Sequence, residues 1–177
     1  MSEMKMIKLF CLSIDKLNEC IAKASAWLIL ILLSAIGYEV VARYVFNSPT
    51  IWSYEVTYFL SSFLIVMGMG YTLKRKGHVG VDILVNVFPM RARAALSIIF
   101  SLIFFFPMLF LIIKMMIPNV LFSFTSNEKS WVGSWLPIIW PFKSWILAGL
   151  VLLFLQGIVE LIRDIAKLWS GRESFES

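Results

Sequence analysis

Four long apolar runs set the pattern of hydrophobic and polar positions along the chain. Each approaches or exceeds the roughly 18 residues that a helix needs to cross the hydrocarbon core of a bilayer. The expected spans cover residues 21–43, 51–73, 94–117 and 141–162. The alternating pattern of a membrane β-strand does not occur in these runs. The pattern therefore predicts an all-α integral membrane protein, with four transmembrane helices in a single membrane domain over residues 1–177.

Two further segments are expected beside the spans. The N-terminal segment is amphipathic, because apolar residues recur at 3-4 spacing on one helical face. These residues are Ile7, Phe10, Ile14, Leu17 and Ile21. The segment is expected either to lie on the inner leaflet or to extend the first span. A short segment at residues 78–89 is expected along the inner interface. Within the third span, Pro107 should introduce a kink, and Pro118 should end the helix.

The composition requires lipid as the solvent of this chain. Hydrophobic residues make up 60% of the sequence, and the mean hydropathy is +0.85. A soluble domain of 177 residues does not bury that much apolar surface.

The basic residues gather on one side of the predicted helices. The net charge is +5, and twelve of the 16 lysines and arginines lie before or at the start of the first span, separate the second span from the third, or follow the fourth. The positive-inside rule then predicts that both termini are cytoplasmic. This distribution explains the basic charge without a nucleic-acid partner. Lys74, Arg75 and Lys76 are expected to form a lipid-facing topology anchor, with specific binding of lipid headgroups as the alternative.

The sequence offers few groups for catalysis or for metal binding. Cys11 and Cys20 form no C-x-x-C motif, and His78 is the only histidine. Neither a metal site nor a nucleophile–base pair is therefore expected. His78 and Asp82 would share one face of a helix, which favours a structural hydrogen bond between them. We expect no enzymatic activity, no catalytic residue and no cofactor.

Four charged residues are expected at similar depth near the outer end of the bundle. They are Glu39, Arg43, Glu55 and Lys114. Charges inside a membrane usually mark a functional site or a pairing partner, so an ion or substrate site and a salt-bridge network are both open. The balance of two acids and two bases near the interface favours the network. Arg43 and Glu55 are expected to pin the first two spans, within the chain or to a partner.

Two stretches resemble the motifs of a known family. The first reads R-Y-V-F-N-S-P-T-I-W-S-Y-E, and its marked positions are Arg43, Asn47, Pro49, Trp52 and Glu55. It resembles the signature of the small membrane subunit of tripartite ATP-independent periplasmic (TRAP) transporters. The second, G-H-V-G-V-D at residues 77–82, is similar to that family's second motif. The resemblance covers residues 21–162, whereas Lys114 and the loop at residues 125–140 depart from the family's pattern.

The resemblance implies a role in transport without catalysis. A member of this family would be a scaffold subunit in the bacterial inner membrane, beside a large membrane (M) subunit that carries the substrate and sodium sites. A periplasmic binding protein would deliver an organic acid anion, such as sialic acid or a C4-dicarboxylate. From their position and charge, Lys129 and Lys143 are the candidate contacts with that protein.

One alternative function remains open from the sequence. A small four-helix transporter could act by itself as a homodimer, but it would need a carboxylate near the middle of its first span. Glu39 is the candidate, and it lies near the outer end of that span.

Overall fold

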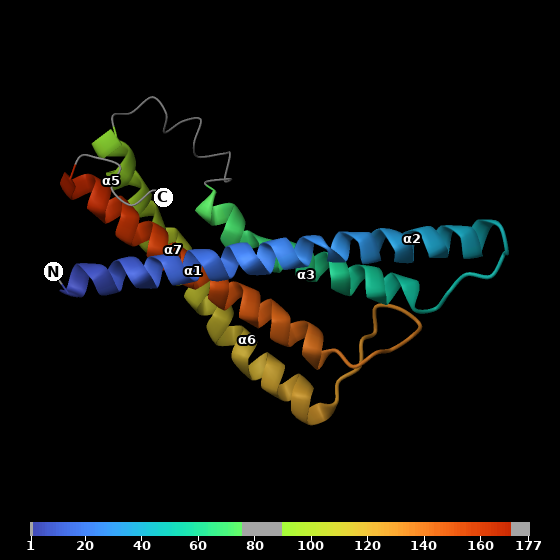
Figure 1. The fold of residues 1–177 in the computed structure, drawn as a ribbon. Coiled ribbons are helices and arrows are strands. Elements are labelled where there is room, and N and C mark those ends of the chain that lie inside the picture. Colours follow the sequence, from blue (N-terminus) through green and yellow to red (C-terminus); the bar gives the residue numbers. More distant parts are fainter. Residues whose placement is uncertain (1, 76–89, 171–177) are drawn as a thin grey trace.

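The computed structural model describes residues 2–75 and 90–170, and these residues form a bundle of long helices (Figure 1). The elements are α1 (Ser2–Ala26), α2 (Leu28–Tyr44), α3 (Ser53–Lys74), α5 (Met90–Phe100), η1 (Ser101–Phe105), α6 (Phe106–Ser126) and α7 (Trp140–Ser170). Four helical stretches are long and apolar enough to cross a membrane: Lys5–Tyr44, Ser53–Lys74, Ala92–Ser126 and Trp140–Trp169. The predicted all-α membrane fold with four spans is confirmed. The expected interfacial segment at residues 78–89 lies outside the described residues, as do its His78 and Asp82.

The first span belongs to one nearly unbroken helix. α1 and α2 are separated only at Trp27, whose N–H donates to the Ala24 carbonyl at 3.3 Å and whose carbonyl accepts from the Leu30 N–H at 3.2 Å. Both hydrogen bonds join residues three positions apart, as in a 3₁₀ turn, and they keep the chain helical through the junction. The N-terminal segment therefore extends the first span. From Lys5 to Tyr44 the helix is about 60 Å long, twice the roughly 30 Å of hydrocarbon core. It must cross the bilayer at a steep tilt or project from it.

The two prolines of the third span act differently. Immediately before Pro107 the chain forms the π-helical turn η1, in which the Phe106 N–H donates to the Ser101 carbonyl. This irregularity lies where a kink was predicted, because Pro107 has no N–H to continue the regular pattern. The prediction that Pro118 ends the span is wrong, since α6 continues through it to Ser126. A proline removes one backbone bond, and the apolar residues that follow still favour a helix in lipid.

The helices form two antiparallel pairs that cross (Figure 1). α2 packs against α3, α6 packs against α7, and α3 contacts α7 where the pairs meet. The connections at residues 45–52 and 127–139 lie at one end, which we call the loop end. The start of α1 and the end of α7 lie at the other, which we call the terminal end.

A glycine permits the close approach of α3 and α7. A Cβ at Gly149 would lie 2.3 Å from Val66 Cγ1 and 3.1 Å from the Val66 carbonyl oxygen, so no larger residue fits without a shift. Aromatic rings fill the adjacent turns toward the loop end: Phe59 stacks on Phe142 at 4.7 Å, and Phe63 meets Trp145 edge-on at 5.3 Å between centroids. Close packing of this kind fixes the crossing of the two pairs.

The interior of the bundle contains both apolar and polar side chains, and its exterior is largely apolar. The largest fully buried side chains are Gln156, Glu55, Val159, Asn18, Ser123 and Ser130. Large apolar side chains are exposed along α2 and α6. Lipid tails can solvate that apolar surface, whereas polar groups hidden from water must find partners inside the protein. The buried polar groups are therefore the candidates for function.

Candidate functional site: polar networks at the two ends of the bundle

At the loop end, Glu39 holds the connection between α2 and α3. Its Oε1 accepts a hydrogen bond from Arg43 Nε at 3.0 Å, one helical turn further on. Its Oε2 accepts from the backbone N–H of Thr50 at 3.1 Å and from the hydroxyl of the same residue. Trp52 stacks on Tyr38 with ring centroids 5.8 Å apart. These contacts fold the connection back against the end of α2.

The backbone of this connection uses the residue types of the family signature. Asn47 has a φ of 49°, the left-handed conformation that asparagine tolerates better than most residues. The N–H of Ser48 donates to the carbonyl of Ala42 at 2.9 Å and so closes the end of α2. An open depression of about 400 Å³ lies between the α2–α3 connection and the loop that joins α6 to α7. It is lined by Pro49, Thr50, Ile51, Tyr54, Val132, Gly133 and Ser134.

Glu55 ties α3 to the loop between α6 and α7. Its side chain is fully buried, and the Ser130 hydroxyl lies 2.9 Å from each of its two oxygens. The backbone N–H of Gly133 donates to Oε1 at 2.8 Å. A buried carboxylate needs hydrogen-bond donors of this kind, because burial removes the water molecules that would otherwise solvate its charge. Glu55 is therefore satisfied by the loop rather than by a basic side chain.

The predicted ring of four mutually neutralising charges does not form. Arg43 pairs with Glu39 within α2, and Glu55 bonds to the loop, so the structure does not bring Arg43 and Glu55 together. Lys114 is exposed on α6, and no ion pair joins it to Glu39 or Glu55 among the described residues. The physical reason is that partners one turn away, or on an adjacent loop, are reached more readily than a charge on another helix.

Lys143, expected as a contact for a periplasmic protein, is engaged within the chain. Its ammonium donates to Ser123 Oγ at 2.6 Å, to Glu128 Oε2 at 2.7 Å and to Asn119 Oδ1 at 2.8 Å. The hydrogen bonds from Lys143, and then from Ser123, hold the pKa of Glu128 below its ordinary value. This cluster locks the start of α7 to the end of α6. Lys129, the other expected contact, is exposed, and its backbone forms an isolated β-bridge with Ile138.

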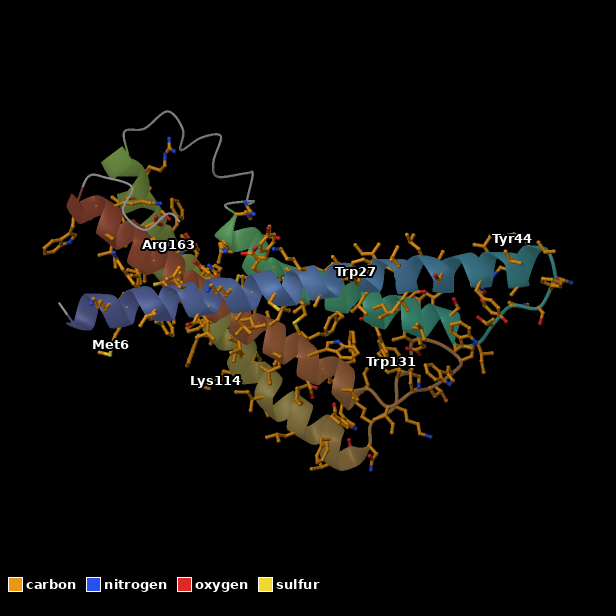
Figure 2. The ribbon with its side chains drawn as sticks, in the orientation of Figure 1. Met6, Trp27, Tyr44, Lys114, Trp131 and Arg163 are labelled. Atoms are coloured by element: carbon orange, nitrogen blue, oxygen red, sulfur yellow. The ribbon has the colours of Figure 1, made fainter. Side chains whose placement is uncertain are left out.

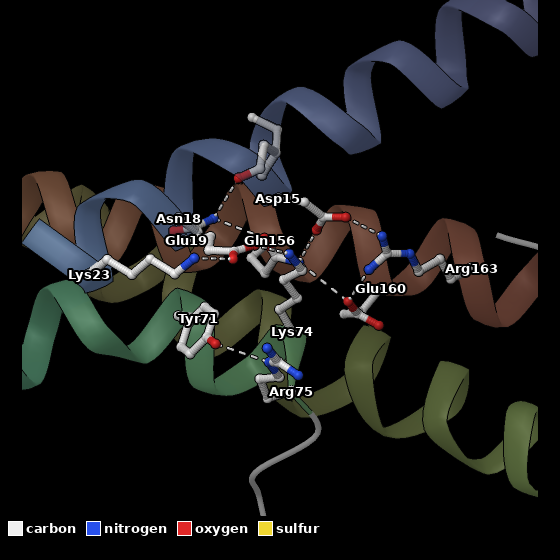
Figure 3. A network of polar contacts seen from close by, with 11 residues as sticks. Asp15, Asn18, Glu19, Lys23, Tyr71, Lys74, Arg75, Gln156, Glu160 and Arg163 are labelled. Atoms are coloured by element: carbon white, nitrogen blue, oxygen red, sulfur yellow. Dashed lines mark hydrogen bonds and ion pairs between the residues drawn. The ribbon is translucent and has the colours of Figure 1, made fainter. Parts of the chain in front are cut away.

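A second network, at the terminal end, ties α1 to α7 (Figure 3). The Gln156 amide donates through Nε2 to Asp15 Oδ1 at 2.9 Å and accepts through Oε1 from Asn18 Nδ2 at 2.8 Å. Arg163 donates to Asp15 Oδ2, and also to Glu160 Oε1 at 2.7 Å. Asp15, Asn18 and Gln156 are all buried. One amide and one guanidinium thus satisfy polar groups from both helices.

The basic residues that end α3 join α1 at the edge of this network (Figure 3). Glu19 accepts from Lys23 at 2.7 Å and from Lys74 at 3.0 Å. Arg75 donates to the Tyr71 hydroxyl at 3.0 Å. Lys74 of the predicted lipid anchor is therefore also a tie between two helices, whereas Lys76 lies outside the described residues.

The sequence prediction of site residues missed the terminal-end network. Its signal is nevertheless present in the chain. Asp15 and Asn18 on α1, like Gln156, Glu160 and Arg163 on α7, recur at 3-4 spacing within stretches that are long and apolar enough to span a membrane. A polar stripe on one face of such a helix indicates that this face packs against protein rather than lipid.

The chemistry available to these networks is structural. In the two described ranges, no group of three or more His, Cys, Asp and Glu side chains could hold a metal ion. Asp15, Glu55 and Gln156 bond to neighbouring helices and loops instead, whereas the buried Asn18 Oδ1 and Arg163 Nε have no hydrogen-bond partner among the described residues. The arrangement holds four helices and two connections in fixed relative positions.

Comparison with known proteins defines the class of this four-helix membrane bundle. A family model described as "Tripartite ATP-independent periplasmic transporters, DctQ component" matches residues 32–167. The chain belongs to this family of small TRAP permease subunits, as its resemblance to the family indicated. Together with its four spans, this makes the chain a multi-pass inner-membrane protein.

Individual relatives match over shorter stretches. The C4-dicarboxylate TRAP transporter small permease protein DctQ of Vibrio cholerae is 34% identical over 61 residues, which are 34% of this chain and 26% of that protein. The sialic acid TRAP transporter small permease protein SiaQ of the same species is 30% identical over 71 residues, 40% of each chain. The sialic acid TRAP transporter permease protein SiaT of Haemophilus influenzae is 33% identical over 55 residues, 31% of this chain and 9% of SiaT. This chain thus covers less than half the length of each of these relatives.

Proposed function

We propose that this chain is the non-catalytic scaffold subunit of a sodium-driven TRAP importer. A large membrane (M) subunit carries the substrate and sodium sites, and a periplasmic binding protein delivers the substrate. The similarity to the permease SiaT, of which the matched stretch is a small part, supports a permease partner. The substrate is an organic acid anion, and the names of DctQ and SiaQ support the C4-dicarboxylate and sialic acid classes.

The observation that carries the scaffold role is the use of the buried polar groups. Glu55 is bonded to the loop between α6 and α7, and the buried Asp15 and Gln156 bond across the α1–α7 contact. A carrier must exchange protein contacts for substrate contacts during its cycle, which requires polar groups that are free in one of its states. Polar groups that are bonded between helices are not free to bind a substrate, and they hold the bundle rigid instead.

The same two ends of the bundle support an orientation of the chain in the membrane. Lys74 and Arg75 lie at the terminal end with the start of α1 and the end of α7, so basic residues gather there. The positive-inside rule supports cytoplasmic termini, with the loop end facing the periplasm. Arg75 is exposed and supports contact with anionic lipid headgroups. At the loop end, the exposed Lys129 remains the candidate contact with the binding protein.

The homodimeric transporter receives no support from the geometry. That function requires a carboxylate free to bind and release an ion inside the membrane. Glu39, the candidate for it, bonds to Arg43 and to Thr50, and thereby shapes a connection at the end of the bundle.

Co-purification tests the proposed function. The full chain is tagged, expressed together with the large subunit, extracted in mild detergent and analysed by light scattering. The proposal predicts a stable complex of the two chains that binds the periplasmic protein. A variant with Lys129→Ala should form the same complex and bind that protein more weakly. A tagged chain that is recovered only as a monomer or a homodimer would contradict the scaffold role.

A further inference from the structure

We propose that Lys114 marks the face of α6 that docks against the partner, and that a transmembrane helix of the partner presents a carboxylate to the Lys114 ammonium. The inference rests on the proposed function, which supplies a large membrane-embedded partner. It adds to that function the face of this chain that meets the partner and the chemistry of the contact.

Lys114 is a single cation within an exposed apolar surface (Figure 2). Its side chain lies on the side of α6 that faces away from α7. The exposed side chains around it on that face are large and apolar: Phe110, Leu111, Met115, Ile117 and Leu121. Across residues 2–75 and 90–170, no hydrogen bond or ion pair satisfies the Lys114 ammonium. An isolated ammonium on such a surface is strongly unfavourable in lipid.

The position of Lys114 on α6 separates its charge from the last residue of the helix and from the loop that follows it. Lys114 lies about 18 Å along the helix axis from Ser126, the last residue of α6. Side chains on a helix lean toward its N-terminus, and for α6 this direction leads away from the loop end. The carboxylate in the loop-end cluster is already bound, because Glu128 accepts from Lys143. Lys114 therefore needs an acceptor at its own depth.

Pro118 adds a second unsatisfied polar group at the same turn. Proline has no N–H, so Pro118 cannot donate the usual helical hydrogen bond to the carbonyl of Lys114. An ammonium and a backbone carbonyl that lacks its normal donor thus lie together on the exposed face. Hydrocarbon satisfies neither of these groups, whereas polar side chains of an adjacent helix can satisfy both.

The positive charge of Lys114 determines which kind of partner can cover this face of α6. A carboxylate neutralises the ammonium and accepts its hydrogen bonds, and ion pairs of this kind are how charges are accommodated inside membranes. A lipid phosphate also carries negative charge, but it is confined to the headgroup region of the bilayer. A transmembrane helix can place an acidic side chain at the depth of Lys114. We therefore assign this face to a protein helix rather than to a lipid headgroup.

Charge reversal tests the assignment in the intact complex. The full chain, carrying Lys114→Glu, is co-expressed with the large subunit and purified through its tag. We expect at least a tenfold loss of recovered large subunit with this variant and near-normal recovery with Lys114→Arg. Lys129→Glu, the same charge change in the exposed loop, is the matched control and should leave recovery unchanged. If the wild-type chain recovers the large subunit and Lys114→Glu recovers it equally well, the assignment is wrong while the proposed function stands.

Photo-crosslinking supplies a second measurement that does not depend on how the charge variant folds. A photoreactive phenylalanine analogue replaces Met115, which is 74% exposed beside Lys114, in an otherwise unchanged chain. Irradiation of membranes is expected to yield a covalent adduct whose mass is the sum of this chain and the large subunit. Adducts with lipid alone would overturn the assignment.

Discussion

Glu55 of α3 and Ser130 of the loop between α6 and α7 are joined by a buried hydrogen bond. The Ser130 hydroxyl lies 2.9 Å from both oxygens of the Glu55 carboxylate, although the two residues are 75 positions apart in the chain. Both side chains are almost completely buried. This contact joins the two helix pairs at the loop end, and the N–H of Gly133 reinforces it.

Removing the Glu55 carboxylate should release the loop from α3. Glu55→Ala leaves the Ser130 hydroxyl and the Gly133 N–H without their acceptor, so we expect the free energy of unfolding to fall by about 2–3 kcal/mol. Equilibrium unfolding in mixed micelles measures the change. Tyr54→Phe alters an exposed neighbour and should stay within about 0.5 kcal/mol of the wild type. In a double-mutant cycle of Glu55→Ala with Ser130→Ala, a coupling energy of zero would show that the bond contributes nothing.

Arg163 should be the most sensitive position of the terminal-end network. Arg163→Met leaves Asp15 and Glu160 without their shared cation, and we expect a loss of about 3 kcal/mol in the free energy of unfolding. Adding Asp15→Asn to the same chain should recover part of that loss. Lys23→Met is the control, because the Lys23 side chain is 71% exposed and its pair with Glu19 contributes little. Equal effects of Arg163→Met and Lys23→Met would contradict the network.

The crossing of α3 and α7 should depend on the absence of a side chain at Gly149. Gly149→Ala places a Cβ against the Val66 side chain and backbone, and this overpacking should cost about 1–3 kcal/mol. Gly37→Ala is the matched control, because a Cβ at Gly37 meets nothing within 4 Å. Thermal unfolding in detergent compares the two variants. A lower melting temperature for Gly37→Ala than for Gly149→Ala would show that the close approach is not a constraint.

The loop-end cluster should weaken in acid. The pKa of Glu128 is lowered from its ordinary value of 4.5 by the hydrogen bonds from Lys143 and Ser123. The stabilisation is therefore complete above that ordinary value, and it disappears as the pH falls through the lowered pKa of the folded chain. Protection of loop amides from hydrogen exchange, corrected for the intrinsic rate, should fall over this range. Glu128→Gln should remove the part of this pH dependence that Glu128 causes. Identical pH profiles of amide protection for the wild type and the variant would contradict the assignment.

The membrane spans were predictable because apolar length is a local property of the chain. The same holds for Glu39 and Arg43, whose spacing of one helical turn places them together within α2. The end of the third span was not predictable, since the helix continues past Pro118 to Ser126 in an environment that favours helices. Sequence rules for helix ends apply to chains in water, which competes for the backbone hydrogen bonds of a helix. Lipid offers no such competition, so a helix can continue past a proline.

The partners of the buried polar groups were beyond local reasoning. Glu55 meets Ser130 only because the loop folds across the end of α3, and Asp15 meets Gln156 only because α1 crosses α7. Lys143 was predicted from its position and charge as a contact with the binding protein, and it is instead bonded to three side chains of this chain. Each of these pairings depends on how distant segments are placed, which the spacing of residues along one helix does not determine.

Uptake by reconstituted liposomes tests the scaffold role most directly. Liposomes receive this chain alone, the large subunit alone, or both, with the loaded periplasmic binding protein outside and an inward sodium gradient. The account predicts concentrative uptake of the organic acid anion only when both membrane chains are present. Sodium-driven uptake by this chain alone would contradict it.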